Sequence, residues 1–120
     1  MPAASRAELP IIQASIDLIR WFIPLLNRLP RQHKFGLGDR MVDGLYELVD
    51  GLVMARYSRP GAKLELLEPL AGRIDLLQIQ TRLLQDFQLI DLGRYEHASR
   101  LIGEVSRQLT GWINQQRREA

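Results

Sequence analysis

Residues 62–87 read AKLELLEPLAGRIDLLQIQTRLLQDF, and the spacing of their apolar side chains determines the expected fold class. The candidates for a core in this stretch are Leu67, Leu70, Ile74, Leu77, Thr81 and Leu84. Their intervals of three and four residues return to one face of an α-helix, whereas a half-buried strand alternates every second residue. The stretch therefore predicts one long amphipathic helix.

Three other segments show the same periodicity, at about residues 8–28, 38–57 and 92–116. The helices are separated by short stretches with helix-breaking residues, namely LPRQHKFG, SRPG and QLID. Short connections place long consecutive helices side by side in opposite directions. The sequence thus predicts an all-α, up-down-up-down antiparallel four-helix bundle, and we expect residues 1–120 to form a single domain.

The first two predicted helices carry more apolar side chains than one core-facing stripe requires. In the first helix we assign Ile12, Ile16, Ile19, Ile23 and Leu26 to the core, which leaves a second stripe of Ile11, Leu18, Phe22, Leu25 and Leu29. In the second helix the core stripe is Met41, Leu45, Leu48, Leu52 and Ala55, and the extra stripe is Val42, Tyr46, Val49 and Val53. In the last helix the core stripe is Tyr95, Ala98, Ile102, Val105, Leu109 and Trp112. The extra stripes indicate either one broad core or contact with another copy of the chain.

Glycines inside two of the helices also indicate contact with another helix. Gly44 and Gly51 lie seven residues apart, on one face of the second helix, and Gly103 and Gly111 lie in the last one. Glycine in a helix costs up to about 1 kcal/mol relative to alanine, a cost that is tolerated where another helix approaches closely. We therefore expect close packing at these positions, within the chain or between subunits.

Composition excludes several classes of protein. The chain has no cysteine, which removes disulfides, thiolate zinc sites and cysteine nucleophiles. Its most apolar stretch, LIRWFIPLL, is shorter than the roughly 20 residues that cross a bilayer, so we expect a cytoplasmic protein without membrane contact. The net charge is only +2, but of the 16 basic residues only Lys34 and Lys63 are lysines. Arginine suits phosphate and carboxylate contacts, but a GC-rich genome would give the same bias, so composition permits an anionic partner without requiring one.

Enzymatic chemistry finds little support in the sequence. The acidic residues Asp39, Asp43, Glu47 and Asp50 recur at helical spacing. A di-iron bundle would need inward-facing glutamates with Glu-x-x-His motifs, and neither His33 nor His97 has a glutamate three residues before it. We therefore interpret the acidic row as a solvated or salt-bridged face, and we predict a protein that is not an enzyme and has no cofactor and no metal.

The connection before the second helix is the most basic part of the chain. FGLGDR lacks the further residues of a dinucleotide site or a P-loop, and we expect Asp39 to cap the helix that follows. Arg28, Arg31, Lys34 and Arg40 cluster around this connection and form a candidate site for a nucleic-acid backbone. On the third and fourth helices, aromatic residues do not interleave with the arginines Arg73, Arg82, Arg100 and Arg107, so we expect salt-sensitive phosphate contacts rather than base stacking.

Three stretches resemble a known family. LPRQHKFGLGDRM, KLELLEPLAGRIDLLQIQTRLLQDFQLI and YEHASRLIGEVSRQLTGWI are similar to the accessory variability determinant (Avd) proteins of diversity-generating retroelements, a group of small four-helix bundles that includes proteins of ribosomal RNA intervening sequences. The resemblance covers about residues 11–113, and its most specific parts are the R-x-H-[KR]-F-x-L-G-[DE]-R connection and the final L-x-G-W-I.

The resemblance implies a non-enzymatic accessory protein that forms a barrel-shaped homopentamer. Its expected partners are further copies of itself, a reverse transcriptase and template RNA or another nucleic acid. Arg31, Lys34 and Arg40 match basic positions of the family's connection motif, and Arg82 matches an arginine of the third helix. The chain departs from the family at Gln78, where an arginine is frequent, which weakens the expected contribution of that helix. An interaction bundle of the intervening-sequence type, without nucleic-acid activity, is the alternative.

Overall fold

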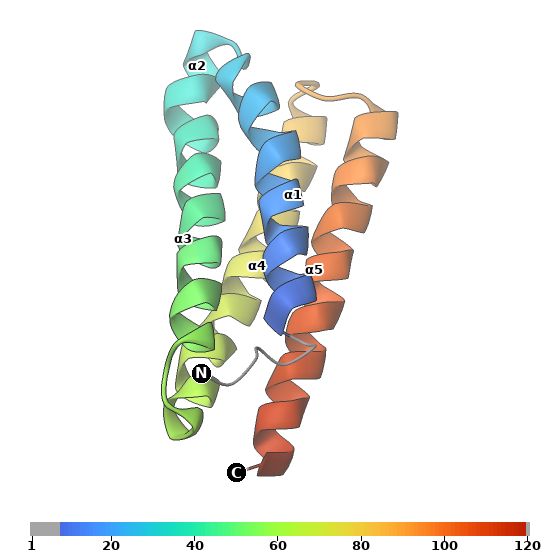
Figure 1. Ribbon diagram of the computed structural model, residues 1–120. Coiled ribbons are helices and arrows are strands. Elements are labelled where there is room, and N and C mark those ends of the chain that lie inside the picture. Colours follow the sequence, from blue (N-terminus) through green and yellow to red (C-terminus); the bar gives the residue numbers. More distant parts are fainter. Residues whose placement is uncertain (1–7, 120) are drawn as a thin grey trace.

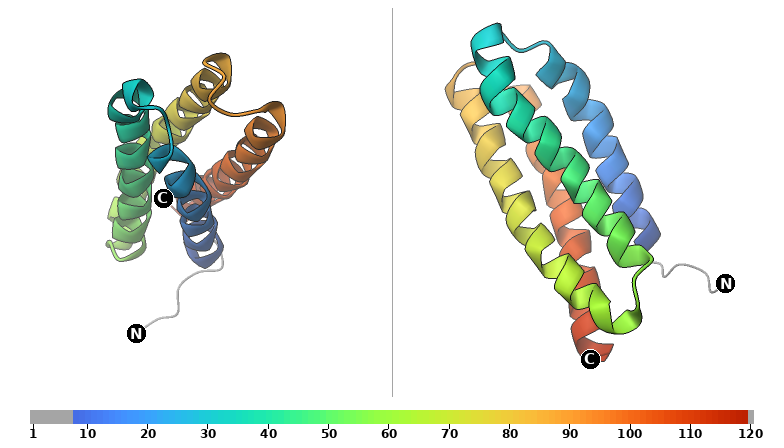
Figure 2. Two further views of the ribbon diagram at one scale, coloured as in Figure 1. Left: turned by 90° about the horizontal axis from the view of Figure 1, so that it is seen from above. Right: turned by 90° about the vertical axis from the view of Figure 1, so that its left-hand side faces the viewer.

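A computed structural model describes residues 8–119 of the chain. Four long helices make up most of it (Figure 1): α1 (Glu8–Asn27), α3 (Asp39–Arg56), α4 (Lys63–Asp86) and α5 (Leu92–Glu119). Each packs against the next long helix and α5 packs back against α1, so the four surround one apolar core (Figure 2). The predicted antiparallel four-helix bundle is confirmed for the described residues, which contain no strand.

The helix boundaries agree closely with the predicted ones. The first three long helices are each shorter than predicted by one residue at one or both ends, and α5 continues to Glu119 instead of ending at residue 116. A short 3-10 turn, η2 (Pro60–Ala62), joins α3 to α4. None of the helices in the described part combines the length and hydrophobicity that crossing a bilayer requires.

Most of the core of α1 lies on a different face from the predicted one, since of the five predicted core residues only Leu26 is buried. Ile11, Leu18 and Phe22, which we placed on the second stripe, are buried, whereas Ile12, Ile16, Ile19 and Ile23 are only half-buried. The two rows are one residue apart, or about 100° around the helix, and both have helical period. The buried row is hard to recognise in the sequence, because the polar residue Ser15 lies in the middle of this row. The Ser15 hydroxyl is buried and donates a hydrogen bond to the Ile11 carbonyl at 2.9 Å, which satisfies it.

In the other helices the predicted core is confirmed. All five core residues of α3 and all six of α4 are buried. In α5 every predicted core residue is buried except Tyr95, which is half-buried and packs against the core. Trp112 is fully buried in this core, so the tryptophan of the L-x-G-W-I motif is a packing residue.

The connection between α1 and α3 is helical rather than a loop. A single helical turn, α2 (Arg31–His33), continues through a π-helical turn, η1 (Lys34–Gly38), directly into α3. The predicted cap at Asp39 is therefore wrong, since its backbone N–H already donates to the carbonyls of Lys34 and Gly36, and α3 has no side-chain cap. Gly38 has ordinary helical torsion angles, so the connection needs it for another reason than flexibility.

Two of the helical glycines permit close packing within the chain. A Cβ atom on Gly38 would lie 3.3 Å from both the His33 carbonyl oxygen and Leu29 Cδ1. A Cβ on Gly51 would lie 2.6 Å from Leu70 Cδ2, so Gly51 lets α4 approach α3. Cβ atoms on Gly44, Gly103 and Gly111 would meet no described atom within 4 Å, so packing within the described chain does not explain these three.

The extra apolar stripes of α1 and α3 lie beside each other. The Trp21 ring is 5.4 Å from the His97 ring of α5, so the row of Ile23, on the opposite flank of α1, faces the side of α3. On α3, Gly51 faces α4, which turns the row of Val53 toward α1 by the same reasoning. The two rows form one lateral surface, the α1–α3 face, made of Ile12, Ile16, Ile19, Ile23, Val42, Tyr46, Val49 and Val53.

Candidate nucleic-acid interface

The predicted basic residues gather at one end of the bundle, where the α1–α3 and α4–α5 connections both lie (Figure 1). Arg28 follows α1, Arg31 lies in α2, Lys34 begins η1, Arg40 lies in the first turn of α3, and Arg82 lies one turn before the end of α4. The four arginines are exposed and Lys34 is half-buried. We call this set the basic end. Three of its residues lie in the α1–α3 connection, one in α3 and one in α4, and only Arg82 is brought to this end by the packing of the helices.

The side chains of the basic end have no carboxylate partner among the described residues. Elsewhere in the described chain, arginines do pair with carboxylates, as in Arg73–Glu47 and Arg117–Glu68. Residues 28–38 contain no acidic residue, and Asp39 is the first one that follows. A phosphate can therefore bind these cations without first breaking an ion pair, so their charge is available to a ligand.

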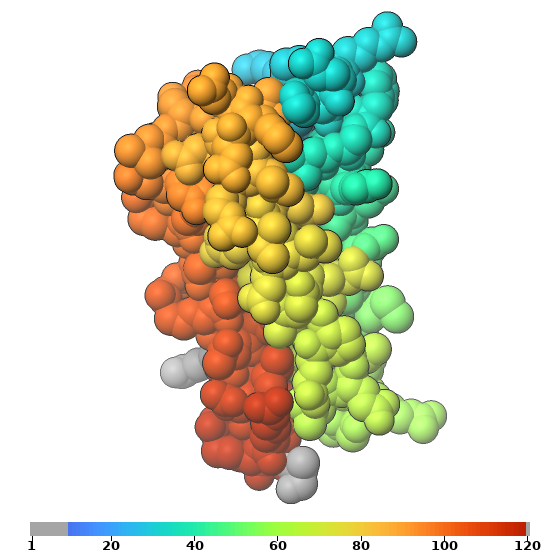
Figure 3. Space-filling view, turned by 180° about the vertical axis from the view of Figure 1, so that it is seen from behind, coloured from blue at the N-terminus to red at the C-terminus, as the bar shows by residue number. Residues whose placement is uncertain are grey.

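The basic end is divided between different sides of the bundle. Arg28 lines a hollow of about 340 Å³ between α1 and the start of α5, together with Trp21 and Arg94. Arg40 instead lies in a groove between α3 and α4. Arg82 is nine residues after Arg73, which is about 180° around the helix. Because Arg73 reaches α3 through Glu47, Arg82 points away from α3. Figure 3 shows the side of the molecule that α4 and α5 cover.

Arg94 belongs to the same end but was not predicted from the sequence. Its guanidinium pairs with Asp91 at 3.2 Å, and its backbone N–H donates to the other Asp91 carboxylate oxygen at 2.8 Å. Asp91 thereby caps the start of α5. Arg94 lines the same hollow as Arg28 only because α5 begins beside the end of α1. No local signal in the sequence indicates that these two arginines lie near each other.

Aromatic side chains also lie among the residues of the basic end. Phe35 is 65% exposed and its ring centroid lies 5.9 Å from the Lys34 ammonium group. Phe87 is 51% exposed, and its ring stacks on His33 with the centroids 5.3 Å apart. Phe35 is adjacent to the basic residues in the sequence and was overlooked, whereas only the fold brings Phe87 to this connection.

The acidic row of α3 has the predicted character. Asp39, Asp43, Glu47 and Asp50 are all exposed, and Glu47 forms an ion pair with Arg73 of α4. Among the described residues, no three side chains of His, Asp or Glu lie close enough together to hold a metal ion. The row is therefore a solvated and partly salt-bridged surface.

These features define a small helical-bundle protein, and none of the charged side chains in its described part is buried. The chain matches the family described as bAvd-like over residues 10–116, and it belongs to that family. The match covers all four long helices, as the resemblance of the sequence indicated. A comparison with curated proteins gave no match.

Proposed function

We propose that this protein is a non-enzymatic accessory factor of a diversity-generating retroelement, which assembles from several copies and binds a reverse transcriptase and its template RNA. Membership in the bAvd-like family supports the accessory role. The observation that carries RNA binding is the basic end, in which five cations lack carboxylate partners among the described residues. Phosphate contacts by such cations release counterions, so binding weakens as salt is added.

Self-association is supported by the α1–α3 face. Monomeric proteins rarely leave a large contiguous apolar surface exposed to water, and on this face Tyr46 is 47% and Val53 is 37% exposed. A second copy would cover these side chains. A homopentamer, the assembly that the family resemblance implies, would also bring five basic ends together, so that the modest charge of one chain is multiplied.

The RNA-binding part is tested with a double variant and a charge-matched control. Arg31→Ala with Lys34→Ala removes two cations of the basic end, and Arg59→Ala with Arg118→Ala removes two at the opposite end of the bundle. With a labelled single-stranded RNA, we expect only the first pair to weaken binding at low salt. It should also reduce the slope of log affinity against log salt by about 1.4, since each contact contributes about 0.7.

Equal losses in the two double variants would contradict the assignment of the RNA site. Arg82→Ala is measured separately, because Arg82 points from the other side of α4. Binding of the polymerase is tested by co-purification with the reverse transcriptase encoded at the same locus. Failure of both binding tests would reject the proposal.

The acidic row of α3 favours one alternative, an interaction bundle of the intervening-sequence type that binds no nucleic acid. The row places four carboxylates next to the basic end and leaves the whole chain with a net charge of only +2. Absence of RNA binding even at low salt, together with intact self-association, would support this alternative.

A further inference from the structure

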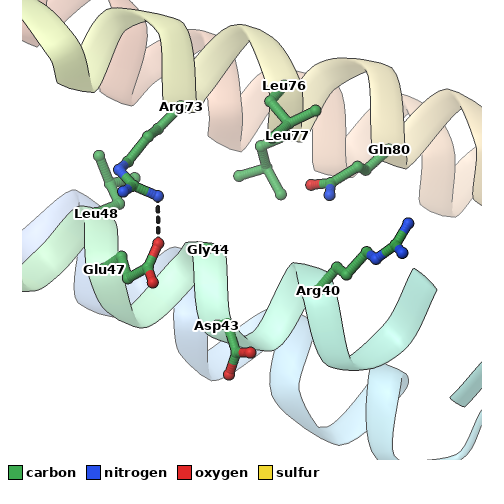
Figure 4. Close-up of a pocket in the computed structure, with 9 residues that line it drawn as sticks. All are labelled: Arg40, Asp43, Gly44, Glu47, Leu48, Arg73, Leu76, Leu77 and Gln80. Atoms are coloured by element: carbon green, nitrogen blue, oxygen red, sulfur yellow. Dashed lines mark hydrogen bonds and ion pairs between the residues drawn. The ribbon is translucent and has the colours of Figure 1, made fainter. Parts of the chain in front are cut away.

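A groove of about 260 Å³ opens between α3 and α4 (Figure 4). We call it the α3–α4 groove and define it by Arg40, Gly44, Leu48, Leu76, Leu77 and Gln80. Gly44 is the reason why it exists, since a Cβ atom there would project into space with no described atom within 4 Å. Packing within the chain did not explain Gly44. Its missing side chain thus creates a recess on the surface.

The middle of the groove is apolar. Leu48 and Leu77 are buried beneath it, and Leu76 stands at its wall with 51% of its surface exposed. At one end, the ion pair of Glu47 and Arg73 connects the two helices and closes the groove. An apolar group that enters would therefore displace water from leucine side chains, which is favourable.

The other end of the groove is polar and lacks partners. Gln80 is only 9% exposed, yet its amide has no hydrogen-bond partner among the described residues. Figure 4 shows the Gln80 amide and the Arg40 side chain at this same end. The Gln80 amide is not among the buried polar atoms that lack a partner, so it is open to solvent in the groove, and no described carboxylate pairs with Arg40. Both groups are thus available to a ligand.

Charge and size together indicate the kind of ligand. Arg73 neutralises Glu47. Asp43 also lines the groove but forms no ion pair with Arg40, and Figure 4 shows its carboxylate turned away from α4, so Arg40 remains the unpaired cation beside Gln80. A carboxylate can accept hydrogen bonds from both a guanidinium and an amide NH₂ group. The volume of about 260 Å³ is below the 300–1,000 Å³ that is usual for small-molecule and cofactor sites. It suits a protein side chain that anchors a larger partner.

From this geometry we infer that the α3–α4 groove is a docking site for a peptide segment of a partner protein, in which a large apolar side chain stands next to a carboxylate. The apolar side chain packs on Leu48, Leu76 and Leu77, and the carboxylate binds Arg40 and Gln80. The groove lies on the opposite flank of α3 from the α1–α3 face, so it is not part of that face. The inference does not depend on RNA binding.

The test uses the full chain and the peptide acetyl-Gly-Phe-Glu-Gly-amide, with binding measured by saturation-transfer NMR on the peptide, which suits weak affinities. Two further peptides replace Glu by Gln or Phe by Ala. We expect each replacement to weaken binding at least fivefold, because the first removes the charge and the second the apolar anchor. Equal binding of all three peptides would overturn the inference.

A matched pair of variants locates the site. Gly44→Leu fills the groove and should weaken binding of the peptide at least tenfold, whereas Gly72→Leu adds the same side chain on the exposed surface of α4 and should change nothing. Both glycines are helical and have open space at the Cβ position, so both variants should fold. Unchanged binding by Gly44→Leu would overturn the inference.

Arg40→Gln tests the charge. We expect this variant to bind the Glu and Gln peptides with equal affinity, while wild-type protein prefers the Glu peptide at least fivefold. Uridine 5′-monophosphate serves as the competitor. If the nucleotide displaces the peptide from wild-type protein, and the Gly44→Leu variant no longer binds the nucleotide, the groove is a nucleotide site and the inference is wrong.

Discussion

The imidazole ring of His33 stacks on the phenyl ring of Phe87, with centroids 5.3 Å apart and planes inclined by 24°. This contact joins the helical connection before α3 to the end of α4, two segments that are far apart in the sequence. It also fixes the connection that carries Arg31 and Lys34. The two cations are therefore held by a contact between rings and not only by the local helix.

Loss of this stack should loosen the basic end. Phe87→Ala is expected to lower the free energy of unfolding by about 1 kcal/mol, the usual contribution of an aromatic pair. It should also speed amide hydrogen exchange in residues 31–38. Phe35→Ala is the control, because Phe35 is 65% exposed and stacks on no ring. Similar exchange rates in the two variants would show that the stack does not order the connection.

The glycines of α3 should respond to alanine in opposite ways. At Gly51 a methyl group would lie 2.6 Å from Leu70 Cδ2. We expect Gly51→Ala to lower the free energy of unfolding by about 1 kcal/mol, because the cost of overpacking exceeds the gain in helix propensity. At Gly44 the space is open, so Gly44→Ala should raise the free energy of unfolding by about 0.5–1 kcal/mol. Urea denaturation of both variants provides the measurement, and equal signs would contradict the packing of Gly51 on Leu70.

The α1–α3 face should be the surface through which copies associate. Ile16→Lys with Val53→Lys places two charges on this face without entering the buried core. We expect the double variant to sediment as a single 13.8 kDa chain, while wild-type protein forms larger assemblies. Ile79→Lys changes an isoleucine of α4 that is 48% exposed and should leave assembly unchanged. A wild-type protein that sediments as a monomer would exclude this role for the face.

Phe35 should give the basic end a preference for unpaired bases. Stacking of one base on an aromatic side chain contributes about 1–3 kcal/mol, so Phe35→Ala is expected to weaken binding of single-stranded RNA at least about fivefold. Binding of duplex RNA, whose bases are already stacked, should change less than twofold. The comparison of the two affinities at one salt concentration is the measurement. Equal losses for the two RNAs would indicate that Phe35 acts on folding and not on bases.

Apolar periodicity predicted the number and order of the helices, and the short connections predicted their directions, because both are local properties of the sequence. The periodicity is less informative about which face is buried. It failed on the face of α1, where two rows offset by one residue have the same period and Ser15 interrupts the row that is buried. It also failed at Asp39, since an acidic residue after glycine is typical both of a helix cap and of a helix that simply continues.

The candidate site was predictable only in part. Arg28, Arg31, Lys34 and Arg40 lie near one another in the sequence, so their common location follows from local structure. The sharing of a hollow by Arg28 and Arg94, and the separation of Arg40 from Arg82, depend on how the helices pack. The α3–α4 groove could not be predicted, because an absent side chain at Gly44 produces a recess only where α4 stands opposite.

The α1–α3 face runs along the length of the rods, whereas the unpaired cations lie at their tips. Subunits that join flank to flank around a rotation axis parallel to the rods must therefore present all their cationic tips on one rim. A flexible RNA strand bound to one basic end would meet the basic end of the next subunit at a high effective concentration. This raises avidity without any new contact. Two-fold pairing in opposite directions would instead place the tips at far ends, and this benefit would be lost.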